Sequence, residues 1–209
     1  MKKIQHDESF LDPALSHHGK SGALLAKAEF ESLVSQGLVP EPEIVFVSPL
    51  QRTLQTAAIL FPKHPNTYVR EYLKEKATGA KFDTASPYEK MKERQTFDFM
   101  DFQQLEHFDK RRVSYIVDDS KEGDAELRRR AAGLVTRLRS TKEDVIGIVT
   151  HKGYLRELER GLFGQPELSG MGKGPGSEFD NCEVRIYSVV LEPDGSVDAM
   201  CRYFRGFHA

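Results

Sequence analysis

The sequence lacks the features that mark small secreted, metal-binding or membrane-spanning proteins. Its two cysteines, Cys182 and Cys201, are too few for a disulfide framework, and their spacing fits no metal motif. We expect them to be buried free thiols in a reducing compartment. No apolar run approaches the length of a transmembrane helix, and residues 1–8 contain no apolar run of the signal-peptide type. We therefore expect a soluble cytoplasmic protein without a membrane partner.

An excess of charge of either sign is also missing. The chain has 30 Lys and Arg against 32 Asp and Glu, which gives a formal net charge of -2. Nucleic-acid and membrane-surface binders usually carry a basic excess, so we expect neither as a partner. A small positive site within a neutral protein is compatible with this balance.

The two common nucleotide-binding motifs are absent. No Gly-x-x-x-x-Gly-Lys-Ser/Thr loop occurs, and no Gly-x-Gly-x-x-Gly follows a predicted strand. The glycine-rich stretch at 170–176 contains Pro175 and precedes no predicted helix, so we interpret it as a flexible loop beside the site. An unrelated nucleotide-binding α/β protein is thereby disfavoured.

The 209 residues are 39% hydrophobic, enough for one sizeable core, and we expect a single domain over 1–209. Short apolar runs predict buried strands at 44–47, 67–70 and 145–149. Apolar residues at helical spacing predict helices after Ser16 up to Gly37, between Pro49 and Pro62, and around 127–138 and 155–162. A hairpin is predicted from 184–191 and 197–204. Residues 76–122 follow neither pattern and are interpreted as an insertion or cap with short helices. This order predicts an α/β fold with a mainly parallel central sheet flanked by helices.

Polar residues follow the first predicted strand in the order Ser48-Pro49-Leu50-Gln51-Arg52-Thr53-Leu54-Gln55-Thr56-Ala57. In open α/β sheets, ligands bind at the carboxyl ends of the strands, and the N–H groups of a helix start favour anions. Arg52 lies in the first turn of the predicted helix, where its planar fork could hold two phosphate oxygens. Taken alone, an ordinary solvated arginine is the simpler interpretation.

A second polar group, Thr150-His151-Lys152-Gly153, follows the strand at 145–149. A histidine at a strand end is more often structural than catalytic. Its place at the carboxyl edge of the sheet favours a functional role, in which an imidazolium binds phosphate and assists its transfer.

Together, the two segments resemble the histidine phosphatase superfamily, the phosphoglycerate-mutase-like proteins. Further segments resemble this family in the same order along the chain: Leu11-Asp12-Pro13-Ala14-Leu15-Ser16-His17-His18-Gly19, Tyr72-Leu73-Lys74-Glu75-Lys76-Ala77-Thr78-Gly79, and Asn181-Cys182-Glu183-Val184-Arg185. The resemblance implies a phosphoglycerate-mutase-like fold and transfer of a phosphoryl group through a phosphohistidine.

The resemblance also implies roles for three residues. Arg52 would bind phosphate oxygens, and His151 would bind phosphate and hydrogen-bond the phosphoryl group during transfer. Glu75 would be the general acid for the leaving oxygen and then the base for water. Glu71 is the alternative carboxylate, and we favour Glu75 because of the following Gly79. No metal or other cofactor is implied, because arginines and histidines supply the positive charge.

One departure from the family concerns the nucleophile, which lies in an Arg-His-Gly triplet on the first strand. This triplet occurs nowhere in the chain, and residues 1–10 are too polar for a buried strand. We therefore expect the first central strand to be missing. We interpret His17 and His18 as the start of a helix and His6 as part of a polar tail.

Two explanations follow from the missing triplet. Either the chain is an N-terminally truncated enzyme whose missing segment supplies the phosphohistidine, which we favour, or it is an inactive homologue that binds phosphate. A missing central strand predicts poor solubility or a loosened core.

We expect a phosphatase acting on a phosphorylated small molecule or protein. A catalytically inactive phosphate-binding or regulatory protein and a phosphomutase are the alternatives. Selectivity is expected from 76–122 and from the loop at 164–180, so the substrate stays open, as does the oligomeric state. The basic run at 110–112 is interpreted as solvated surface.

Overall fold

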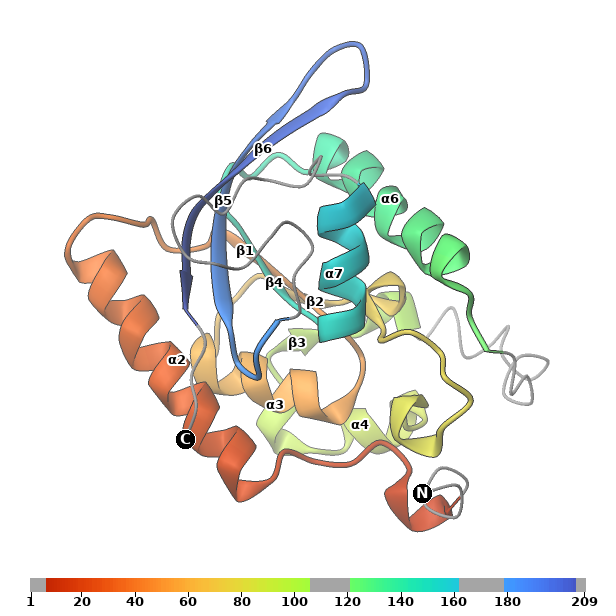
Figure 1. Cartoon of the computed structure of the whole chain (residues 1–209). Coiled ribbons are helices and arrows are strands. Elements are labelled where there is room, and N and C mark those ends of the chain that lie inside the picture. Colours follow the sequence, from red (N-terminus) through yellow and green to blue (C-terminus); the bar gives the residue numbers. More distant parts are fainter. Residues whose placement is uncertain (1–6, 106–120, 162–178, 206–209) are drawn as a thin grey trace.

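A computed structural model describes residues 7–105, 121–161 and 179–205, and Figure 1 shows their arrangement. The α-helices are α2 (His17–Ser35), α3 (Gln51–Leu60), α4 (Tyr88–Lys92), α6 (Asp124–Ser140) and α7 (Lys152–Gly161). The strands are β1 (Ile44–Val47), β2 (Thr67–Val69), β3 (Met100–Asp101), β4 (Ile146–Val149), β5 (Val184–Leu191) and β6 (Val197–Arg205). Short 3-10 helices are η1 (Glu8–Phe10), η2 (Glu71–Leu73), η3 (Lys81–Asp83) and η4 (Gln95–Phe97).

The central sheet is parallel throughout and has the strand order β3-β2-β1-β4. Strand β1 is central, with Val47 paired to Val69 of β2 on one side and to Val149 of β4 on the other. All parallel strands therefore end at the same edge. The predicted α/β class with a mainly parallel central sheet is confirmed.

Strand β1 shows why the sheet needs helices on both faces. Successive side chains of a strand point to opposite faces, and all four residues of β1 are buried. Val45 and Val47 belong to a cluster with Leu54 of α3, whereas Ile44 and Phe46 pack with apolar residues of α6 and α7. The continuous apolar run thus becomes two cores, one on each side of the sheet.

Helix α2 begins and ends where the sequence predicts. The Ser16 side chain accepts a hydrogen bond of 3.1 Å from the Gly19 N–H and caps the helix. Gly37 follows the last turn with a φ of 68°, a conformation that glycine adopts without steric strain. The helix packs on α3, and the rings of Phe30 and Phe61 meet edge-on at 5.7 Å. The interpretation of His17 and His18 as an exposed helix start is confirmed.

The described parts of the 76–122 segment, 76–105 and 121–122, contain short helices together with a strand that the sequence analysis did not predict. Strand β3 is only two residues long and pairs with β2. Met91, Phe97 and Met100 are buried in the core on the α3 side. The segment therefore completes the core beneath β1 and β2. The basic run at 110–112 lies outside the described residues.

The predicted hairpin forms from β5 and β6, which pair antiparallel in a sheet of their own. Its Tyr187 and Val197 pack in the same apolar cluster as Ile146 and Ile148 of β4. Within the described residues, β4 nevertheless pairs with β1 alone and forms an edge of the parallel sheet. The hairpin therefore joins the fold through side chains rather than through a backbone ladder.

Both cysteines are free and half-buried, and burial raises the pKa of each thiol. Among the helices that the structure describes, none has the length and apolar character needed to cross a bilayer.

We predict a loosened sheet at β4. Peptide groups of an unpaired parallel strand edge lack ladder partners, so the amides of β4 that face away from β1 should exchange their hydrogens faster than those of β1. The chain should also unfold at a modest temperature and bind a hydrophobic dye. Hydrogen exchange, thermal denaturation and dye fluorescence measure these effects, and a sharp, high unfolding transition with equal protection of both strands would contradict the prediction.

Candidate active site

His151 lies at the carboxyl edge of the sheet, between β4 and α7. The parallel pairing of β1 with β4 brings Ser48, which follows β1, beside it. The Ser48 Oγ and the His151 Nε2 share a hydrogen bond of 2.7 Å, and both residues are buried. Residues 103 positions apart in the sequence thus meet because two strands end together.

The environment of His151 favours the neutral form of its imidazole. Burial, followed by the positive charges of Arg52 and Arg130, holds its pKa well below the usual value of 6.5. A neutral ring can accept a hydrogen bond at one nitrogen and donate one at the other. The imidazolium considered in the sequence analysis is therefore disfavoured in the site as it stands.

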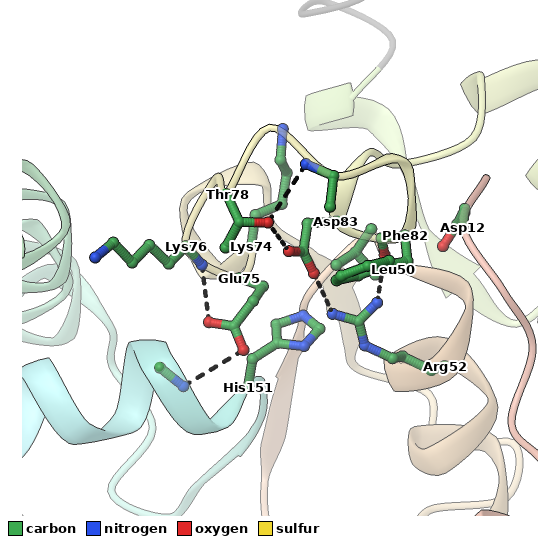
Figure 2. A network of polar contacts seen from close by, with 12 residues as sticks. Asp12, Leu50, Arg52, Lys74, Glu75, Lys76, Thr78, Phe82, Asp83 and His151 are labelled. Carbon is green, nitrogen blue, oxygen red and sulfur yellow. Dashed lines mark hydrogen bonds and ion pairs between the residues drawn. The ribbon is translucent and has the colours of Figure 1, made fainter. Parts of the chain in front are cut away.

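Arg52 lies in the first turn of α3, as predicted, and its guanidinium points into the site (Figure 2). Nη1 donates to the Phe82 carbonyl at 2.6 Å, and Nη2 donates to the Asp83 carboxylate at 3.1 Å. Asp83, itself buried, also accepts a hydrogen bond from the Thr78 hydroxyl at 2.6 Å. The fork is thus oriented by the 78–83 loop, and its charge is matched by a carboxylate.

Glu75 lies in the loop after η2, and Figure 2 shows its carboxylate beside His151. Oε1 accepts from the Lys76 N–H at 2.8 Å, and Oε2 accepts from the Gly153 N–H at 3.4 Å. The alternative carboxylate, Glu71, instead pairs with the Lys74 ammonium at 2.6 Å. The structure therefore brings Arg52, Glu75 and His151 together. Of the two alternative carboxylates, Glu75 and not Glu71 lies beside His151.

The remaining described histidines lie elsewhere. His17 and His18 are exposed on the first turn of α2. His64 hydrogen-bonds the Pro42 carbonyl at 2.9 Å and accepts from the Asn66 N–H at 3.3 Å, at the opposite edge of the sheet. His6 lies outside the described residues.

Three polar residues of the site were not identified from the sequence. Ser48 was quoted within its motif but without a role, whereas Asp83 and Arg130 carried no motif signal at all. The Asp83 contact with Arg52 spans 31 positions of the chain, and the Arg130 contacts with the carbonyls of residues 72–75 span 55 or more. Such pairings follow from tertiary packing, and no local pattern marks them.

Arg52 supplies positive charge for an anion at the site. Among the described residues, no group of three or more His, Cys, Asp or Glu could hold a metal ion. An arginine, a neutral imidazole and a carboxylate at one sheet edge can bind a phosphoryl group and exchange a proton with it. A model of the histidine phosphatase superfamily (branch 1) matches residues 6–192. The chain belongs to this superfamily.

Solved structures of two phosphatases and of a hydrolase share the fold. The mycobacterial glucosyl-3-phosphoglycerate phosphatase has a TM-score of 0.56 and 17% identity, over 95% of this chain and 89% of its own. A protein described as mycobacterial hydrolase 2 has a TM-score of 0.59 and 17% identity, over 95% and 82%. The phosphoserine phosphatase of Entamoeba histolytica has a TM-score of 0.51 and 15% identity, over 94% and 86%. A search of curated protein sequences found no match.

We predict that Gly153→Ala displaces Glu75 without destabilising the protein. A Cβ at Gly153 would lie 2.4 Å from Glu75 Oε1, the tip of a flexible side chain that can move away. Alanine in the first turn of α7 should leave the unfolding free energy unchanged or raise it by up to about 1 kcal/mol. The amide resonance of Lys76, a residue that the substitution leaves unchanged, should shift as it loses the carboxylate.

Gly133→Ala is the matched control, because its Cβ would meet the tip of Arg137 at 2.9 Å on helix α6. This variant should leave the Lys76 resonance in place. If Gly153→Ala left it in place too, Glu75 would not be held at this helix start.

We also predict a specific pH dependence of stability. Because the folded pKa of His151 lies well below 6.5, the unfolded chain binds more protons between the two values, and stability rises with pH there. The unfolding free energy should fall as pH drops below about 6.5, by at most about 1.4 kcal/mol per pH unit from this group. It should stop falling from this group below the folded pKa. Urea titrations at several pH values measure the unfolding free energy of the wild type and of His151→Asn. If the free energy had the same pH dependence in both proteins, the effect would not come from His151.

Proposed function

We propose that the protein is a phosphatase that removes a phosphoryl group from a phosphorylated small molecule or protein through a phosphohistidine. The observation that carries the proposal is the meeting of Arg52, Glu75 and His151 at one sheet edge in a chain of this superfamily. The phosphatase names of the structural neighbours agree with it.

Each residue has a distinct role in this proposal. Arg52 binds the oxygens of the transferring phosphoryl group, and its bonds to the 82–83 turn orient its remaining N–H donors. His151 hydrogen-bonds the same group through a ring that Ser48 holds in place. The developing charge is thereby met by donors that are already oriented before the reaction.

Glu75 supplies the proton. When the phosphoryl group leaves its oxygen for a histidine nitrogen, the oxygen takes a proton from Glu75. In the second step, the carboxylate takes a proton from the water that attacks the phosphohistidine. The phosphoryl group thus ends as inorganic phosphate, and Glu75 returns to its starting form.

The alternative of a phosphate-binding protein without turnover rests on two observations. The chain contains no Arg-His-Gly triplet. The two arginines whose charges lower the pKa of His151 are also matched by carboxylates, Arg52 by Asp83 and Arg130 by Glu122. A dianion bound here must then compete with built-in negative charge.

The proposal predicts hydrolysis of a generic aryl phosphate that depends on the site. Arg52→Ala should lower kcat/KM by about 10²-fold or more, the usual effect of losing one donor to the transition state. His151→Ala should cause a similar loss. The exposed Arg202→Ala on the hairpin is the matched control and should retain full activity. Phosphate release is measured with the purified wild type and with each of the three variants.

Turnover by this chain requires a nucleophile among its own histidines, with His6, His17, His18 and His151 as the candidates, and acid quenching with phosphate mapping of the reacting protein identifies which histidine carries the phosphoryl group. A chain that is folded but inactive, and that binds inorganic phosphate through Arg52, would favour the binding protein. Full activity in both site variants would contradict the proposed site.

A further inference from the structure

Arg130, on α6, makes an unusual number of contacts with the loop that carries Glu75. Its Nη1 donates to the carbonyls of Tyr72 at 2.9 Å and Lys74 at 2.7 Å, and its Nη2 donates to the carbonyl of Glu75 at 3.2 Å. Three carbonyls of one irregular segment therefore converge on a single guanidinium.

Glu122 holds the other side of the guanidinium. Its carboxylate accepts from Arg130 Nε at 2.8 Å and from Nη2 at 2.6 Å. The same residue also binds the Glu75 loop directly, because its N–H donates to the Ala77 carbonyl at 2.8 Å and its carboxylate accepts from the Ala77 N–H at 3.3 Å. Arg130 and Glu122 thus bracket the loop on both sides of Glu75.

These contacts use the full donor capacity of Arg130. An arginine has five N–H donors in a fixed fork, and Arg130 makes five hydrogen bonds. Its side chain is 23% exposed, and its guanidinium lies 5.4 Å from the ring centroid of Tyr154. With no donor left over, Arg130 is built to fix the loop rather than to bind phosphate.

Arg130 and Glu122, together called the clamp, determine how firmly the backbone beneath the Glu75 carboxylate is held. Residues 74–80 have no regular structure, so no helix or ladder fixes this segment. Among the residues that the structure describes, the carboxylate itself is held by the N–H groups of Lys76 and Gly153, and the second bond is long at 3.4 Å. Its placement at His151 therefore depends on how firmly the backbone is fixed.

We propose that Arg130, oriented by Glu122, is the positioning residue that holds Glu75 at His151 for proton transfer. The inference rests on the proposed function for the chemical role of Glu75. Misplacing a catalytic group by about 1 Å can cost about 10²-fold in rate, so the clamp affects kcat rather than phosphate binding.

The first test measures position without turnover. In Arg130→Gln and Glu122→Gln, the Lys76 and Gly153 amides should exchange hydrogen at least about tenfold faster, a factor that corresponds to about 1.4 kcal/mol of lost local stability. Amides of β1 and α3 should keep their protection. Arg139→Gln is the matched control. Arg139 also lies on α6, and it also donates to two carbonyls, those of Glu192 and Ser196 in the hairpin turn. Unchanged exchange at Lys76 and Gly153, or equal acceleration everywhere, would overturn the inference.

The second test uses the leaving group. A nitrophenolate leaves without a proton, whereas an alkoxide needs one. Arg130→Gln should therefore lower kcat/KM for an alkyl phosphate by about 10²-fold more than for p-nitrophenyl phosphate, because kcat/KM reports the steps up to departure of the leaving group, whereas the later attack of water is common to both substrates. Glu75→Gln should show the same pattern, and the double variant should be no worse than Glu75→Gln alone. Arg130→Lys, with three donors and no fork, should restore only part of the rate.

The outcomes separate the two proposals. If Glu75→Gln shows the leaving-group pattern and Arg130→Gln does not, the positioning role is wrong and the phosphatase proposal stands. If the wild type hydrolyses neither substrate, the phosphatase proposal fails, and the exchange experiment still decides whether the clamp holds Glu75.

Discussion

The parallel pairing of β1 with β4 is the constraint on which the site depends. With Val47 opposite Val149, the residues that follow these strands, Ser48 and Thr150, emerge side by side. Thr150 then donates to the Leu73 carbonyl at 2.7 Å and ties the His151 turn to the Glu75 loop. A slip of one residue in this register would turn Val45 and Val47 away from their core and separate Ser48 from His151. Core packing and site geometry are therefore set by the same pairing.

Charge in the site is arranged in matched pairs around a neutral ring. Arg52 lies against Asp83, and Arg130 lies against Glu122, so each cation is held in place by a buried or half-buried carboxylate. Both arginines still lower the pKa of His151. A carboxylate that orients an arginine also reduces its attraction for an anion, so the site gains order at some cost in phosphate affinity.

The sequence was sufficient to predict most of the scaffold, because β1, β4, α2 and α6 have continuous apolar runs or clear helical spacing. Strand β3 escaped prediction because two residues carry no periodicity, and it exists only through pairing with β2. Arg52 and His151 were predicted because each follows a recognisable strand and belongs to a motif. Arg130 was not, because its contacts join α6 to residues 72–75 and have no signature within either segment.

Under the proposed function, phosphate binding at this site would be coupled to proton uptake. The neutral state of His151 arises from burial and from two nearby positive charges, and a bound dianion would offset the second cause. A phosphoryl group on Arg52 would therefore raise the pKa of His151 toward its usual range and favour the imidazolium. The same anion would repel Asp83, whose bond to Arg52 is 3.1 Å long, and the Thr78 hydroxyl remains as its other partner. Under the proposed function, the imidazolium considered from the sequence would accompany a bound phosphoryl group, which would also compete with Asp83 for Arg52.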